Sequence, residues 1–204
     1  MSGLTPGLSP LPARIARILI TGFMGAGKTT VGSLLADRLG WDFADSDYLL
    51  EAQTGQTIAA IFASRGEPAF RDLEAATIRA SVTRDRLVLA LGGGALERAD
   101  TRDLLASLPD SVLIFLDAPL DVLVSRCSGQ ANAPVRPVLA DRARLQERWT
   151  ARLHGYRQAH LTVDTEGCSP EEVAERILRP IVDRCQGIAA QGSGSVPRRT
   201  GVPA

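Results

Sequence analysis

Short apolar runs alternate along this chain with longer stretches whose apolar residues recur every three or four positions. The clearest run spans Ile15 to Thr21, where β-branched residues fall on both faces, as in a strand buried on both sides of a parallel sheet. Similar strands are predicted at residues 41–45, 87–91, 112–116 and 161–163. Strands that alternate with helices predict an α/β fold, a three-layer α/β/α arrangement with a central parallel sheet of about five strands.

Two helical segments have the clearest patterns. The segment that begins at Lys28 places its large apolar residues on one face. A later helix has Ser169 as its cap, Pro170 in its first turn and Glu172 three residues beyond the cap. The apolar residues are Val31, Leu34, Leu35 and Leu39 in the first helix and Val173, Ile177 and Ile181 in the second.

The two ends of the chain differ in composition from its middle. Residues 1–13 are rich in proline and glycine, which predicts a flexible N-terminal lead-in. Residues 187–204 contain a Gly-Ser run and few large apolar side chains, which predicts a disordered C-terminal tail. The chain has 204 residues, of which 45% are hydrophobic, enough for one well-packed domain over residues 14–186.

Composition narrows the range of partners. The 23 basic and 23 acidic residues cancel, so the strongly basic balance that would indicate nucleic-acid binding is absent and any cationic site must be local. No apolar run is long enough to cross a bilayer, and the N-terminus lacks the features of a signal peptide. Cys127, Cys168 and Cys185 follow no metal or disulfide spacing, which favours a reducing compartment. We therefore expect a cytoplasmic protein that binds neither nucleic acid nor a membrane.

A glycine-rich motif follows the first predicted strand. Residues 22–29 read Gly-Phe-Met-Gly-Ala-Gly-Lys-Thr and match the phosphate-binding loop (P-loop) G-x-x-x-x-G-K-[ST]. Its glycines let backbone N–H groups turn toward phosphate oxygens, and the N-terminus of the next helix adds partial positive charge. Lys28 can reach the β- and γ-phosphates of ATP, and the Thr29 hydroxyl can ligate Mg²⁺. The residues expected at the nucleotide are Gly25, Ala26, Gly27, Lys28, Thr29 and Thr30. The loop alone does not separate a kinase from a GTPase, a motor or a regulatory switch.

Two charged pairs follow the loop. Asp45 and Asp47 lie two residues apart after the second predicted strand, so in an extended segment their carboxylates point to the same side. One can hold Mg²⁺ while the other accepts a hydrogen bond from an attacking hydroxyl, although this pattern alone is also typical of an exposed acidic turn. Arg71 and Glu74 lie one helical turn apart. An arginine held by a carboxylate is oriented to bind a ligand carboxylate, but the same pair also fits a surface ion pair.

Three later segments carry further candidate residues. Gly92 to Gly94 follow a buried strand, where glycines allow either close approach of the backbone to a ligand or a flexible turn. Residues 129–137 are rich in small side chains and include Arg136, which suits a lid that brings positive charge to a transferring phosphoryl group. Arg152 and Tyr156 lie one turn apart on the helix that follows.

The order and spacing of these motifs together resemble the shikimate kinase family. The resemblance covers residues 17–184, and the Phe-Arg run with the triple glycine is its most specific part. It implies a P-loop kinase of the nucleoside monophosphate kinase-like type, with a substrate-binding segment at about residues 46–75 and a lid at about residues 127–142. The matching residues are Gly22 to Gly32, Asp45 and Asp47, Gly66 and Glu67, Phe70, Arg71 and Glu74, Gly92 to Gly94, Arg136 to Leu139, Arg152 and Tyr156, and Val163 to Thr165 with Pro170.

The resemblance also implies an activity: a monomeric enzyme transfers the γ-phosphoryl group of ATP to the 3-hydroxyl of shikimate, on the route to chorismate and the aromatic amino acids. Arg71 and Arg152 would hold the carboxylate of shikimate, and Glu74 would orient Arg71. Asp47 would hold the ring hydroxyls and either remove a proton or align the attacking oxygen. The implied catalytic residues are Lys28, Asp47 and Arg136, the substrate ligands are Asp47, Arg71, Gly93 and Arg152, the Mg²⁺ ligands are Thr29 and Asp45, and Arg136 also contacts the nucleotide.

The sequence departs from the family pattern in two places. His154 stands where the family often has proline, and the segment between Arg126 and Arg136 is a few residues longer than usual. The extra residues leave open whether Arg126 matches the arginine that stacks on adenine in the family. None of these departures removes a group that holds the substrate.

Two other functions remain open at this point. One is a kinase of similar fold that acts on gluconate or a nucleoside monophosphate. A nucleotide acceptor requires several phosphate-binding arginines, whereas the segment between Asp47 and Glu74 offers only Arg65 and Arg71, which favours a small carboxylic acid. The other is a regulator that binds a nucleotide without catalysis, which would have no need of Asp47, Arg71 and Arg152.

Overall fold

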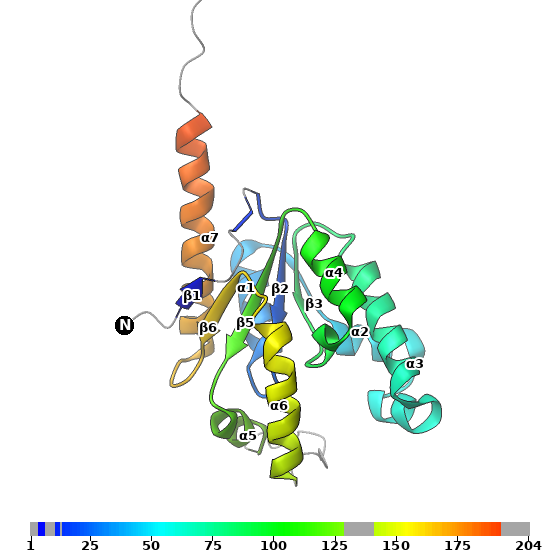
Figure 1. The fold of residues 1–204 in the computed structure, drawn as a ribbon. Helices are drawn as coiled ribbons and strands as arrows, with labels where there is room; N and C mark the ends of the chain where they lie inside the picture. The colour runs from blue at the N-terminus through cyan, green and yellow to red at the C-terminus, as the bar shows by residue number, and fades with distance from the viewer. Residues whose placement is uncertain (1–3, 7–10, 13, 129–140, 193–204) are drawn as a thin grey trace, which may run out of the picture.

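The computed structural model describes residues 4–6, 11–12, 14–128 and 141–192. At its centre is a six-stranded sheet in the order β1-β6-β5-β2-β4-β3 (Figure 1). The five strands from β6 to β3 are parallel to one another, as expected, and β1 pairs with β6 in the antiparallel direction. The strands are β1 (Leu4–Pro6), β2 (Arg17–Thr21), β3 (Asp42–Asp45), β4 (Leu87–Ala90), β5 (Ser111–Asp117) and β6 (Leu161–Asp164).

Helices cover both faces of this sheet and complete the three-layer α/β/α arrangement. Helix α1 packs against α7, β3 and β4 on one face, and α4 and α6 lie on the opposite face, toward the viewer in Figure 1. The helices are α1 (Lys28–Leu39), α2 (Ser46–Thr54), α3 (Ile58–Ser81), the short 3₁₀ helix η1 (Ala95–Glu97), α4 (Ala99–Ser107), α5 (Leu120–Ser128), α6 (Arg142–Tyr156) and α7 (Pro170–Gly192).

The core explains why the apolar runs form strands. Every residue of β2 and β4 is buried, as expected for parallel strands covered on both faces. Helix α7 adds the apolar residues that recur every four positions, and Val173, Ile177 and Ile181 are all buried. Its predicted start is also confirmed: the Ser169 N–H donates to Glu172 Oε2 at 2.7 Å, and the Glu172 N–H donates to Ser169 Oγ at 3.2 Å.

The topology gathers the polar motifs at one edge of the sheet. The P-loop follows β2, Asp45 ends β3 and Gly92 lies just beyond β4. These strands are parallel, so their carboxyl ends meet at the same edge. Strand β2 lies between β4 and β5, where the strand order reverses, and α/β proteins bind ligands in the crevice at such a point.

Two segments differ from the sequence expectations, and a third lies outside the residues that the structure describes. Leu4–Pro6 falls in the expected lead-in but forms the edge strand β1. Helix α7 continues to Gly192, past the point at which the tail was expected to begin. The centre of the expected lid, residues 129–140, including Arg136, lies outside the described residues.

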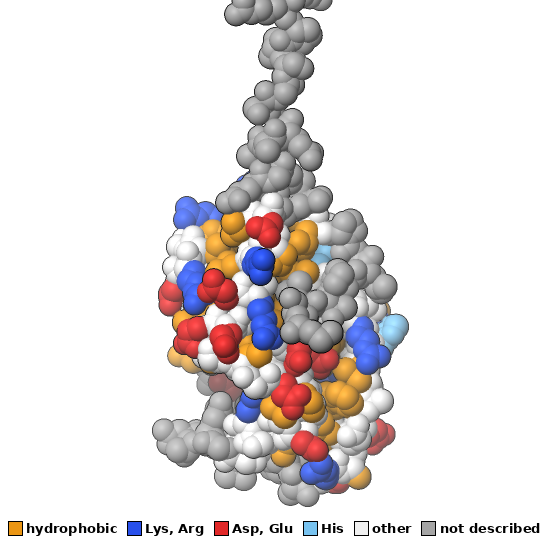
Figure 2. All heavy atoms as spheres, turned by 90° about the vertical axis from the view of Figure 1, so that its left-hand side faces the viewer, with side chains coloured by type: hydrophobic (Ala, Val, Ile, Leu, Met, Phe, Trp, Pro, Cys, Tyr) orange, Lys and Arg blue, Asp and Glu red, His pale blue; other side chains and the backbone are white. Residues whose placement is uncertain are grey.

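The surface is mixed in charge. On the face shown in Figure 2, basic and acidic side chains are interspersed, in keeping with a formal net charge of zero. Within the part of the chain that the structure describes, no helix has both the length and the apolar character needed to cross a membrane.

Candidate active site

The P-loop folds into a shape that requires glycine at several positions. Gly22, Gly25 and Gly27 have φ values of 146°, 77° and 88°, which residues with a Cβ atom rarely adopt. A Cβ on Gly22 would lie only 2.6 Å from the Leu116 carbonyl oxygen. Gly27 caps α1 without a side-chain hydrogen bond, so the first N–H groups of that helix stay available to an anion. The loop therefore fits the phosphates of a nucleotide.

Lys28 and Thr29, the first two residues of α1, point their polar groups in different directions. Lys28 Nζ donates to the carbonyl oxygens of Gly22 and Phe23, at 2.9 and 3.0 Å, and so curls over the loop. Thr29 Oγ1 donates to Asp45 Oδ2 at 2.8 Å. The other carboxylate oxygen of Asp45 accepts the Asp47 N–H at 3.0 Å and caps α2.

The Thr29 hydroxyl and the Asp45 carboxylate together form an oxygen donor set that suits Mg²⁺. Hard cations prefer such oxygens, and Mg²⁺ at phosphate sites usually has one or two protein ligands beside phosphate and water. Among the residues that the structure describes, no group of three or more His, Cys, Asp and Glu side chains is arranged to hold a metal by itself. The pair therefore fits an ion held jointly by the protein and a nucleotide.

Asp47 and Glu74 approach each other at Gly92. A Cβ on Gly92 would lie 2.6 Å from Glu74 Oε1 and closer still to Asp47 Oδ1. The Gly92 N–H donates to Ser46 Oγ at 2.8 Å, which fixes the backbone of the glycine triplet against the start of α2. Burial raises the pKa of Glu74, opposed by its hydrogen bond to Arg71, and the nearby Asp47 raises that pKa further. Glycine at this position thus allows two carboxylates to reach the same point beside the P-loop.

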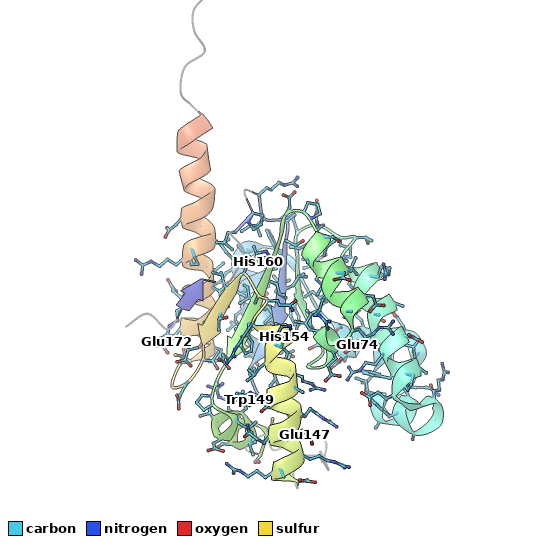
Figure 3. All side chains as sticks on the ribbon, viewed as in Figure 1. Glu74, Glu147, Trp149, His154, His160 and Glu172 are labelled. Atoms are coloured by element: carbon cyan, nitrogen blue, oxygen red, sulfur yellow. The ribbon has the colours of Figure 1, made fainter. Side chains whose placement is uncertain are left out.

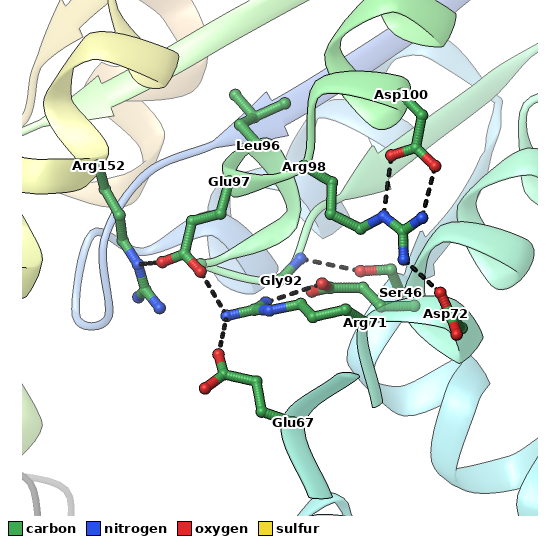
Figure 4. A network of polar contacts seen from close by, with 12 residues as sticks. Ser46, Glu67, Arg71, Asp72, Gly92, Leu96, Glu97, Arg98, Asp100 and Arg152 are labelled. Atoms are coloured by element: carbon green, nitrogen blue, oxygen red, sulfur yellow. Dashed lines mark hydrogen bonds and ion pairs between the residues drawn. The ribbon is translucent and has the colours of Figure 1, made fainter. Parts of the chain in front are cut away.

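Arg71 lies at the centre of a network of carboxylates (Figure 4). Helix α3 breaks at Gly66, and the stretch after the break carries Arg71 and Glu74 one turn apart. Arg71 Nη1 donates to Glu74 Oε2 at 2.8 Å, and Nη2 donates to Glu67 Oε1 at 3.2 Å and to Glu97 Oε2 at 2.6 Å. The expected Arg71–Glu74 pair is thus present, and Glu74, labelled in Figure 3, is almost completely buried.

Arg152 comes from α6 and reaches the same carboxylate, Glu97, from the other side (Figure 4). Its guanidinium lies 5.6 Å from the centre of the Phe23 ring in the P-loop, within the range of a cation–π contact. A Cβ on Gly93 would lie 3.5 Å from Arg152 Nη1. The buried Tyr156 hydroxyl, one turn further along α6, donates to the Gly93 carbonyl oxygen, and burial raises its pKa. The structure therefore brings Arg71 and Arg152 together against the glycine triplet.

Most of these groups line one cleft of about 2030 Å³, among them the carboxylates Glu67, Glu74 and Glu97. The sequence-predicted residues that line it are Gly25, Ala26, Gly27, Lys28, Thr29, Thr30, Asp45, Asp47, Arg71, Gly93 and Arg152. An apolar wall comes from Ile58, Phe62 and Phe70, with the rings of the two phenylalanines 4.5 Å apart. Among the residues predicted for the site, Arg136 lies outside the described part of the chain.

Arg126 and the histidines complete the comparison with the sequence. Arg126 also lines the cleft, where its guanidinium donates to the Thr165 hydroxyl at 2.9 Å and to the Thr165 carbonyl oxygen. His154 is exposed on α6, and His160 accepts the Leu113 N–H at 3.0 Å between two strands (Figure 3). Sequence reasoning missed Glu97, whose only signal was its place three residues after the glycine triplet.

Comparison with known proteins identifies the family. The family model described as shikimate kinase matches residues 24–182. A shikimate kinase from Streptomyces avermitilis is 41% identical over 167 residues, which cover 80% of this chain and 94% of that protein. Another from Thermodesulfovibrio yellowstonii is 40% identical over 162 residues, with 79% and 92% covered.

Solved structures agree with these sequence matches. A shikimate kinase from Acinetobacter baumannii in complex with shikimate superposes with a TM-score of 0.75 at 35% identity and covers 83% of this chain and 94% of that one. A gluconokinase from Sinorhizobium meliloti shares the fold alone, with a TM-score of 0.57 at 19% identity. The nucleotide loop, the glycine triplet and the arginine pair thus lie in a chain that belongs to the shikimate kinase family.

Proposed function

We propose that this protein transfers the γ-phosphoryl group of ATP to the 3-hydroxyl of shikimate and releases shikimate 3-phosphate and ADP. The observation that carries the proposal is the convergence of Arg71 and Arg152, on different helices, at the glycine triplet beside the P-loop. In the reaction, the hydroxyl oxygen forms a bond to the γ-phosphorus, and the bond from that phosphorus to the β,γ-bridging oxygen breaks. The hydroxyl proton leaves to Asp47 or to solvent.

The two arginines would bind the substrate carboxylate. A guanidinium is planar and presents paired N–H groups that match the two oxygens of a carboxylate. Arg71 and Arg152 have only 12% and 10% of their side-chain surface exposed, so their charges are screened little by water. Glu74 would hold Arg71 in place through the 2.8 Å hydrogen bond, since its own side chain is almost completely buried.

Asp47 would orient the hydroxyl that attacks. The Asp47 carboxylate lies next to Gly92 and lines the same cleft as the arginines and the P-loop, so a substrate held by its carboxylate at the arginines would bring a ring hydroxyl to Asp47. Phosphoryl transfer passes through a loose transition state in which positioning contributes more than early removal of the proton. We therefore assign alignment of the attacking oxygen to Asp47, with proton acceptance as a later step.

The P-loop side of the cleft would bind the nucleotide. Lys28 would exchange its hydrogen bonds to the loop carbonyls for phosphate oxygens. Thr29 and Asp45 would hold Mg²⁺, and the bound ion would neutralise charge on the phosphates. Arg136 would add positive charge when the lid segment closes. We further propose that the protein is a cytoplasmic monomer, and the scattered cysteines suit a reducing compartment.

A coupled assay of ADP release tests this proposal directly. Purified protein with MgATP is offered shikimate, gluconate or a nucleoside monophosphate at matched concentrations. We expect kcat/KM for shikimate to exceed that for the other acceptors by at least about 100-fold, because the others lack either the ring or a carboxylate in its place. A preference for gluconate or a nucleotide would reject the assigned substrate. No stimulation of ADP release by any acceptor would favour a regulator that binds a nucleotide without catalysis.

A further inference from the structure

Glu97 occupies the point at which the two substrate-binding arginines meet. It is the last residue of η1, directly beyond the glycine triplet. Its Oε2 accepts from Arg71 Nη2 at 2.6 Å, and its Oε1 accepts from Arg152 Nε (Figure 4). One carboxylate therefore binds both guanidinium groups, each through a different oxygen. The proposed reaction assigns no task to this side chain.

The chemistry of this contact is that expected of the substrate itself. A carboxylate presents two oxygens to donors in one plane, and the proposed substrate brings its own carboxylate to the same two arginines. Arg71 already donates to Glu74 and Glu67, so few of its N–H groups remain for a further carboxylate. A bound substrate and Glu97 must therefore compete for part of the same set of N–H groups.

The exposed fractions of the carboxylates around Arg71 indicate which of them a substrate can displace. The Glu74 side chain is only 4% exposed, so to move it into water would disrupt the packing around it. The Glu97 side chain lines the cleft and is 37% exposed, so it can turn toward water without such disruption. Glu67 is exposed as well, but it contacts Arg71 and not Arg152 among the ion pairs of the described residues.

We propose that Glu97 is a placeholder anion: it holds Arg71 and Arg152 together in the empty site and is displaced by the carboxylate of the substrate. In this role Glu97 determines specificity, because only a ligand whose own carboxylate reaches both guanidinium groups replaces the contacts that Glu97 loses. The inference depends on the proposed function, since it takes the arginines as the carboxylate site. Glu97 touches no reacting atom and is a positioning residue.

The substitution Glu97→Gln tests this role because it keeps the size of the side chain and removes its charge. A neutral amide oxygen is a weaker competitor for a guanidinium than a carboxylate, so we expect KM for shikimate to fall about 3- to 10-fold. The value of kcat should stay within about twofold, because the placeholder is displaced before the chemical step. Calorimetric titration with shikimate should show a matching gain in affinity.

The matched control is Glu67→Gln. It removes one carboxylate from the same Arg71 nitrogen but leaves Arg152 untouched, and its side chain is 61% exposed. We expect this variant to change KM for shikimate by less than about twofold, because exposed pairs contribute little. A thermal melt of each variant verifies that the fold is retained.

The outcomes separate the two proposals. If wild-type protein phosphorylates shikimate and Glu97→Gln lowers KM while Glu67→Gln does not, the placeholder role is supported. An unchanged or raised KM in Glu97→Gln would overturn it, and a raised KM would make Glu97 a simple orienting group for the arginines. If wild-type protein fails to phosphorylate shikimate, the proposed function fails first, whatever the variants do.

Discussion

The substitution Gly94→Ala isolates the position of one guanidinium with a single methyl group. Gly94 has φ −105° and ψ 0°, a backbone conformation that alanine also adopts. Its added Cβ would lie 2.8 Å from Arg71 Cζ, with both terminal nitrogens nearer still. To restore an ordinary contact of about 3.5–4.0 Å, the guanidinium must retreat by about 1 Å. The end of a long side chain can move this far by lengthening the hydrogen bonds that hold Arg71, at a cost of about 1 kcal/mol in stability.

The displaced guanidinium perturbs the proposed substrate site. A displacement of about 1 Å at a positioning group can lower the rate about 100-fold, which corresponds to about 2.7 kcal/mol of transition-state stabilisation. We therefore expect Gly94→Ala to lower kcat/KM for shikimate about 100-fold in the coupled assay. The thermal midpoint should stay within about 3 °C of the wild-type value.

The variant Arg71→Ala provides the control background for this effect. In a protein that already carries Arg71→Ala, the methyl group meets no guanidinium, so Gly94→Ala should lower kcat/KM by a further factor of no more than about two. A full 100-fold loss in that background would exclude displacement of Arg71 as the cause, because the methyl group would then act through something other than Arg71.

Two further substitutions test other parts of the account. Gly25→Ala places a Cβ at φ 77°, 3.0 Å from Cys127 Sγ and closer to the Leu123 carbonyl oxygen. We expect ATP binding to weaken at least about 10-fold in a titration, with a loss of about 1–3 kcal/mol in stability. An unchanged ATP affinity would contradict the role of this loop in nucleotide binding. His160 is half-buried, and burial lowers its pKa below the ordinary 6.5. The unfolded chain therefore takes up this proton at higher pH than the folded chain, so the stability from neutral His160 is present above about pH 6.5 and is lost as the pH falls below it. The thermal midpoint should drop more between about pH 7.5 and about pH 5.5 in wild-type protein than in His160→Gln, whose amide oxygen does not titrate; parallel curves would exclude this role.

Much of the fold was predictable because buried parallel strands leave a strong signal. Residues of β2 and β4 are apolar on both faces, so their runs stand out without knowledge of any neighbour. The order of the strands was not predictable, since an apolar run reveals burial but not which strand lies beside it. Strand β1 was missed because three residues ending in Pro6 carry no pattern, and its pairing with β6 depends on the finished sheet.

Some residues of the site were also predictable from the sequence, and others were not. The carboxyl ends of parallel strands meet at one edge, so Asp45, at the end of β3, lies beside Thr29, with which the resemblance grouped it. The extended segment expected for Asp45 and Asp47 was wrong, because Asp45 caps α2 and Asp47 lies in the first turn of that helix. The approach of Arg152 to Arg71 depends on how α6 packs near η1, which no spacing along the chain encodes. Glu97 lies in a 3₁₀ turn without periodicity, and its importance emerges only from its contacts with both arginines.

The coupling between Arg152 and the substrate carboxylate measures whether the arginine pair binds that carboxylate. Wild-type and Arg152→Ala proteins are each assayed with shikimate and with its methyl ester, which retains the ring hydroxyls and lacks the negative charge. If Arg152 binds the carboxylate, the substitution should lower kcat/KM for shikimate about 30- to 1,000-fold, equivalent to about 2–4 kcal/mol, but lower that for the ester less than about fivefold. Equal losses with both substrates would show that Arg152 does not act through the carboxylate.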